Sequence, residues 1–139
     1  MNPTLTKNFV AEAAIAANII VKQGTADGQV LAGAADTDFI FGVTGELGAA
    51  AANDRVDVIV AGIAEIEVGG AINRGDPVTT DANGKAVAST RHTHVENTAA
   101  AYVQNAVTNA ASAERIIGFA MVNAVAGDIA DVLLAPSLA

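Results

Sequence analysis

The sequence has no cysteine and few aromatic residues. Because none of its 139 residues is Cys, disulfide bridges, thiolate metal ligands and cysteine nucleophiles are excluded. Aromatic residues make up only 4% of the chain, whereas 32 residues are alanine. Each buried side chain therefore removes little area from water. We expect such a thin core to gain further burial by association with itself or with a larger assembly.

Positive charge is also scarce, and no long apolar run is present. The chain carries 7 Lys and Arg against 15 Asp and Glu, which gives a formal net charge of −8. Phosphate groups would be repelled, so nucleic-acid binding is not expected. The apolar stretch from Phe9 to Val21 is interrupted by Glu12 and Asn18. We therefore expect no signal peptide and no membrane contact, and a soluble protein made in the cytoplasm.

Motifs that would carry catalysis are missing. No serine lies in a G-x-S-x-G elbow, and there is no G-x-G-x-x-G segment or P-loop lysine. His92 and His94 would share one face of a strand but lack a third ligand, so a polar loop is the favoured interpretation and a metal site the alternative. Glu65 and Glu67 alternate with apolar residues, as on the solvated face of a strand. We predict no metal, no cofactor and no enzymatic activity.

The pattern from Ile19 onward is that of an all-β protein. Short β-branched runs are separated by Gly, Asp and Asn, and the pairs Asp27-Gly28 and Asn83-Gly84 suit tight hairpin turns. We predict a small β-barrel or β-sandwich of short antiparallel strands. The predicted strands are Ile19–Lys22, Gln29–Leu31, Phe39–Val43, Arg55–Ala61, Ala64–Val68, Val78–Thr80, Lys85–Ala88, Ile116–Val122 and Ile129–Leu134.

The two halves of the chain resemble each other. Residues 21–30, 39–43 and 54–61 match residues 78–87, 116–120 and 128–135 in the same order. In the last pair of segments, Asp54, Asp57, Val58 and Ala61 correspond to Asp128, Asp131, Val132 and Ala135 at identical spacing. This similarity predicts two pseudo-repeated β units. The second unit is longer by about 20 residues.

The predicted organisation is an N-terminal arm followed by one domain. Residues 1–18 begin with a polar segment containing an early proline and form the arm, and residues 19–139 form a single β domain. The extra residues of the second unit are an insertion at about 89–113. Within it, Tyr102 and Val103 belong to an apolar pattern at helical spacing, so the insertion is expected to be a short helix or an irregular segment.

Three segments carry a resemblance to a known family. These are GGAINRGDPVTTDANGKAVA at 69–88, RIIGFA at 115–120 and AGDIADVLLAP at 126–136, with KNFV at 7–10 as a weaker addition. Together they resemble the capsid cement, or decoration, proteins of tailed bacteriophages, over about half to two-thirds of the chain. The insertion departs from the family pattern.

The resemblance implies a structural virion protein with neither a catalytic residue nor a cofactor. Such a protein would lie on the outer capsid surface, bind the major capsid protein at junctions between its copies, and associate as a homotrimer or a dimer. We expect partner contacts at Phe9 and Val10 near the N-terminus and at Tyr102 and Val103 in the insertion. The alternative is another phage β-domain, such as a tail or baseplate domain or a host-surface carbohydrate-binding module. The scarcity of aromatic residues disfavours a carbohydrate site.

Overall fold

The computed structural model describes residues 3–89 and 114–138, and every regular element in these ranges is a β-strand. The first five strands are β1 (Leu5–Ala11), β2 (Ile20–Gln23), β3 (Gln29–Ala32), β4 (Ile40–Thr44) and β5 (Arg55–Ala61). The other five are β6 (Ile63–Glu67), β7 (Pro77–Thr80), β8 (Ala86–Ala88), β9 (Arg115–Ala120) and β10 (Ile129–Leu138). The all-β prediction is confirmed. Most of the predicted insertion lies outside the described residues.

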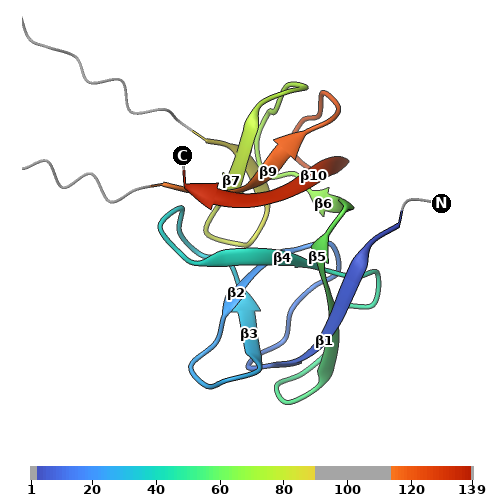
Figure 1. Ribbon diagram of the computed structural model, residues 1–139, viewed down its shortest axis with the longest axis vertical. Helices are drawn as coiled ribbons and strands as arrows, with labels where there is room; N and C mark the ends of the chain where they lie inside the picture. The colour runs from blue at the N-terminus through green and yellow to red at the C-terminus, as the bar shows by residue number, and fades with distance from the viewer. Residues whose placement is uncertain (1–2, 90–113, 139) are drawn as a thin grey trace, which may run out of the picture.

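The strands form two groups, stacked along the long axis of the molecule (Figure 1). The first five strands close a barrel in the order β1-β3-β2-β4-β5. The pair β1–β3 is parallel, and the other neighbours are antiparallel. The remaining strands form a sheet in the order β6-β10-β9-β7-β8. A parallel bridge between Val68 and Ala86 joins the two edges of this sheet. It is the counterpart of the parallel β1–β3 pair that closes the barrel.

The two groups repeat one topology. Read as β3-β2-β4-β5-β1 and β8-β7-β9-β10-β6, the neighbour orders correspond strand by strand. The register corresponds as well, because Val21 lies opposite Gly42 in the barrel and Val78 lies opposite Gly118 in the sheet. The predicted pseudo-repeat is confirmed. We call residues 5–61 the N-terminal unit, and residues 63–88 with 114–138 the C-terminal unit.

The turn before the last strand of each unit is also repeated. The Asp54 carboxylate accepts a hydrogen bond from the amide of Ala51 at 3.1 Å, and the Asp128 carboxylate accepts one from Val125 at 3.1 Å. The residue before each Asp has a positive φ, 69° at Asn53 and 93° at Gly127. Each Asp therefore closes the tight turn that leads into β5 or β10.

The units share a hydrophobic core. One cluster fills the barrel and consists of Ala11, Ile15, Ile19, Val21, Val30, Ala49, Val56 and Val58. The larger cluster fills the C-terminal unit and also includes Ile20, Ile40 and Val43 of the N-terminal unit. Backbone hydrogen bonds from Ile20 to Gly84 and from Glu67 to Asn18 join the units at their rims. One face of the barrel therefore closes the core of the second sheet.

Each predicted strand is present, and the boundaries agree within two residues except at the end of β10. That strand continues past Pro136 to Leu138, because its pairing with β9 is irregular between Leu134 and Ser137 and so tolerates a residue without an amide proton. The expected arm at residues 1–18 contains a strand that the sequence did not indicate. Since β1 pairs with both β5 and β3, the chain from Leu5 onward is part of the barrel.

Candidate interaction surfaces

The described residues offer no site for metal chemistry. Among them, no three His, Asp or Glu side chains gather as metal ligands would. A cleft of about 230 Å³ between the units is lined by Glu46, Glu65 and Asp131, but these carboxylates do not form such a group. His92 and His94 lie outside the described residues. Within the same described ranges no helix is long and apolar enough to cross a membrane.

Each unit has an apolar row that crosses three strands, which we call its outer row. In the N-terminal unit, Val43 lies opposite Ile20 on one side and Ile59 on the other. The outer row of the C-terminal unit occupies the equivalent register positions and consists of Pro77, Phe119 and Leu133. Residues directly opposite each other on paired strands point to the same face of a sheet. Each outer row is thus one continuous strip of side chains.

The two outer rows differ in what covers them. Ile20 and Val43 are fully buried, because they belong to the core of the C-terminal unit. At the equivalent positions, Phe119 is 41% exposed and Leu133 lies opposite it at 45%. Large apolar side chains side by side on a surface mark an interaction site more often than isolated ones do. The outer row of the C-terminal unit is an apolar face without a cover among the described residues.

The second surface is one end of the barrel. It corresponds to the end of the C-terminal unit that the N-terminal unit covers. In that unit, Ile66, Ile117 and Leu134 are buried in the shared core, and Ala88 packs against it. Their register equivalents in the N-terminal unit only border the barrel core and are half-buried. We call these equivalents the open end of the barrel; they are Phe9, Ala32, Phe41 and Val60.

Aromatic rings are concentrated at the open end. Phe9 and Phe41 pack edge to face at 5.4 Å between ring centroids, and Phe39 stacks on Phe41 at 6.3 Å. The Lys7 ammonium lies 5.3 Å from the centre of the Phe9 ring, and the Arg115 guanidinium lies 5.2 Å from that of Phe39. Such ring and cation contacts hold the rings in place. Of the four Phe of the chain, Phe9 and Phe41 belong to the open end, Phe39 stacks on Phe41, and Phe119 belongs to the outer row of the C-terminal unit.

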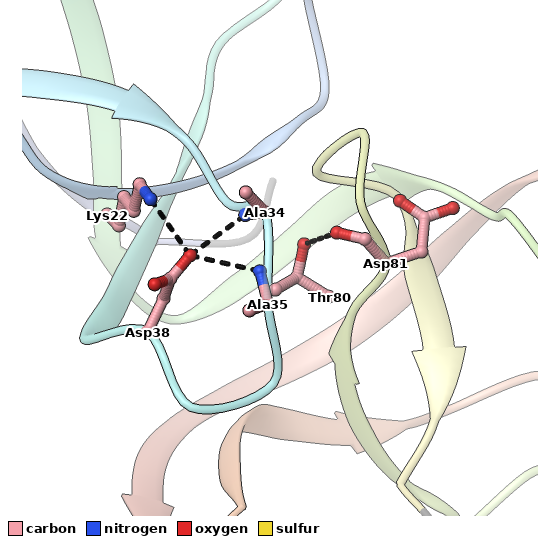
Figure 2. Close-up of polar contacts among 6 residues, drawn as sticks. All are labelled: Lys22, Ala34, Ala35, Asp38, Thr80 and Asp81. Carbon is pink, nitrogen blue, oxygen red and sulfur yellow. Dashed lines mark hydrogen bonds and ion pairs between the residues drawn. The ribbon is translucent and has the colours of Figure 1, made fainter.

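The loop between β3 and β4 carries the charged residue Asp38 (Figure 2). One oxygen of Asp38 accepts hydrogen bonds from the amides of Ala34 and Ala35, both at 3.0 Å, and pairs with the Lys22 ammonium at 3.0 Å. Burial raises the pKa of Asp38, but these three contacts outweigh it and lower the pKa below its ordinary value. The Arg115 amide donates to the Asp36 carbonyl at 2.7 Å, so this loop contacts β9.

The charge of Asp38 should contribute to stability in a pH-dependent way. We expect Asp38→Asn to lower the free energy of unfolding by about 1 kcal/mol at neutral pH, because the ion pair is lost and two amides keep only a neutral acceptor. The folded-state pKa is lowered, so this contribution is present above the unfolded-state pKa and is lost as pH falls through the folded-state value. Urea unfolding at pH 7 and at about pH 3 measures both effects, with the exposed Asp27→Asn as control. An equal loss at both pH values would contradict the prediction.

Of the four predicted contact residues, the structure describes Phe9 and Val10, and it places them on opposite faces of β1. Phe9 lies at the open end, whereas Val10 is on the opposite face of β1, half-buried and opposite Arg55. Tyr102 and Val103 lie outside the described residues. The sequence did not single out Phe41, Phe119 or Leu133. The one signal available for the two phenylalanines was the occurrence of a scarce residue type within predicted strands.

Comparison with known proteins gives a likeness of fold. No family model matches the chain, and no curated protein matches it. A solved structure that is similar is the crystal structure of the N base of the head fibre gp8.5 in bacteriophage phi29. The TM-score is 0.66 at 15% sequence identity, and the alignment covers 99% of this chain and 98% of the other. This chain therefore has the same fold as the base of a phage head fibre.

Proposed function

We propose that this protein is a structural component of a bacteriophage virion that binds the outer surface of the capsid and stabilises the shell, and that it catalyses no reaction. The observation that carries the proposal is the shared fold with a phage head fibre base over nearly the whole length of both chains. The resemblance to capsid cement proteins supports it, because the segments that carry this resemblance contain β7, β8, β9 and most of β10.

The physical mechanism is stabilisation by binding. The major capsid protein is the proposed partner, contacted at junctions between neighbouring copies. A protein that binds the assembled shell but not its separated subunits shifts the equilibrium toward the shell. Each bound copy adds interface area across one junction, and many copies act together on one particle. Net charge of −8 keeps the unbound protein soluble at high concentration.

Capsids that lack the protein provide the test. We expect the purified protein to co-sediment with such capsids and to raise the temperature at which the shells break, followed by light scattering. An unrelated acidic protein of similar size is the control for nonspecific sedimentation. Absence of co-sedimentation, or binding without any rise in the breaking temperature, would contradict the proposal. Binding to purified tails or to a glycan array in place of capsids would favour a tail domain or a carbohydrate-binding module instead.

A further inference from the structure

The internal repeat shows what kind of surface fits an outer row. In the N-terminal unit, Ile20 and Val43 of the outer row are buried in the core of the C-terminal unit and Ile59 packs against it, and β4 contacts β6, β9 and β10 there. The receiving surface includes Ile66, Ile117 and Leu134. Within one chain, therefore, the outer row of one unit closes the end of the other. The strand register identifies the equivalent of the outer row and of the receiving surface in the other unit.

The same two surfaces recur once more in each chain: no described residue covers the outer row of the C-terminal unit, and the residues of the open end are only half-buried. The outer row of the C-terminal unit is equivalent to the row that is buried in the N-terminal unit. The open end of the barrel is equivalent to the surface of the C-terminal unit that buries the outer row of the N-terminal unit. We propose that copies of this chain associate head to tail, with Pro77, Phe119 and Leu133 of one copy seated on the open end of the next. The contact between copies would repeat the contact between units.

The substitutions at equivalent positions are compatible with this contact. Phe119 and Leu133 stand where the covered row has Val43 and Ile59, and Phe9 stands where the receiving surface has Ile66. Phe119 is larger than Val43 and Phe9 is larger than Ile66, so each surface has a ring where the internal contact has an aliphatic side chain, and these rings offer more apolar area for burial. They therefore favour an interface that must also offset the entropy lost when two molecules associate.

Two further positions fit a surface that is exposed before association. The Ile20 amide donates to the Gly84 carbonyl at 2.8 Å, but its equivalent is Pro77, which has no amide proton to leave unpaired. Lys7 stands where the C-terminal unit has the buried Ala64. The Lys7 ammonium lies over the Phe9 ring, 5.3 Å from its centre, and the long apolar stem of a lysine can be covered while its ammonium reaches water.

A head-to-tail contact uses two different surfaces on each copy. Such a contact gives a ring if the rotation between copies closes, and a filament if it does not. We expect a closed ring in solution, with a mass that is a small multiple of the 13.8 kDa chain mass. The inference does not depend on capsid binding, because the association is measured without capsids.

Two charge substitutions test the two surfaces separately. Phe119→Asp changes the outer row and Phe9→Asp changes the open end, and each should raise the dissociation constant at least about 30-fold. Light scattering coupled to size exclusion, over a concentration series, measures the mass. Leu47→Asp, at a side chain that is 96% exposed, is the control and should leave the mass unchanged. Wild-type protein that stays at the mass of one chain, or an oligomer that survives both substitutions, would overturn the proposal.

Mixing the two variants distinguishes a head-to-tail contact from a symmetric one. The Phe119→Asp copy keeps an intact open end, and the Phe9→Asp copy keeps an intact outer row. Their mixture should form a species of two chains, whereas either variant alone should be a single chain. A mixture that remains monomeric while both variants show wild-type thermal unfolding would overturn the proposal, because a head-to-tail contact requires the complementation.

A milder pair of substitutions keeps the test valid if a charged variant fails to fold. The chain has no natural cysteine, so Phe119→Cys and Phe9→Cys each introduce a single thiol. A short bis-maleimide should link the two variants when they are mixed and should link neither variant to itself. Equal linking in the separate samples would contradict the head-to-tail arrangement.

Discussion

Gly118→Ala should lower the free energy of unfolding by about 3 kcal/mol or more, with a fall in Tm of about 10 °C. A Cβ atom at this position would lie 2.0 Å from the carbonyl oxygen of Leu133 and 2.9 Å from its carbonyl carbon. These are backbone atoms of β10, which is paired with β9 along this stretch. They cannot rotate away as a side chain would, so the strands must separate. The loss comes from the hydrogen bonds and packing that this separation disturbs.

The repeat supplies a second variant and the barrel supplies a control. Gly42 is the register equivalent of Gly118, and a Cβ there would lie 2.5 Å from Val58 Cγ1 and 2.8 Å from the Ile59 carbonyl oxygen. Gly42→Ala should therefore also be strongly destabilising. At Gly45 the nearest atom would be 3.8 Å away, so Gly45→Ala should change stability by less than about 0.5 kcal/mol. Thermal unfolding by circular dichroism compares the three. A Tm for Gly118→Ala within about 2 °C of wild type would show that the two strands are not this close.

Ile20→Ala should be the second large effect, at about 2–5 kcal/mol. The Ile20 side chain is fully buried and belongs to the core that the two units share. Removing three carbons leaves a cavity where the barrel meets the second sheet. We expect both units to lose stability together, because one substitution weakens the core that both depend on. Urea unfolding followed by circular dichroism should show one transition at a lower denaturant midpoint, with an unchanged slope.

The matched control is an isoleucine on the surface of the same protein. Ile129 is 54% exposed, so Ile129→Ala should cost less than about 0.5 kcal/mol. If both substitutions cost the same small amount, the outer row of the N-terminal unit is not buried against the second sheet. A separate early transition in the Ile20→Ala protein would likewise show that the units unfold independently.

Local signals in the sequence were sufficient for nine of the ten strands. These strands contain β-branched residues between Gly, Asp and Asn turns, and the turns at Gly28 and Gly84 have the positive φ that the sequence indicated, 78° and 76°. Strand β1 was missed because Leu5–Ala11 mixes polar and apolar residues without clear alternation. It becomes a strand through pairing with β5, which follows more than 40 residues later, and with β3 in parallel. No local pattern contains that information.

The interaction surfaces could be predicted only in part. The sequence indicated Phe9 as a contact residue, and it lies at the open end of the barrel, but that role stays a prediction. The internal similarity already matched segment 39–43, which contains Val43, with segment 116–120, which contains Phe119. It could not show that Val43 is buried while Phe119 is 41% exposed. That difference depends on which unit packs on which, and this is a property of the three-dimensional arrangement.

The order of the strands along the chain also has a consequence during synthesis. All strands of the barrel lie before residue 62, so the barrel can close while the rest of the chain is still being translated. A further 77 residues must follow before β10 is complete at residue 138, which takes about 4–15 s at ordinary translation rates. During that interval Ile20, Ile40 and Val43 have no second sheet to cover them. The nascent barrel therefore presents an apolar face to chaperones and to neighbouring nascent chains until its own second half arrives.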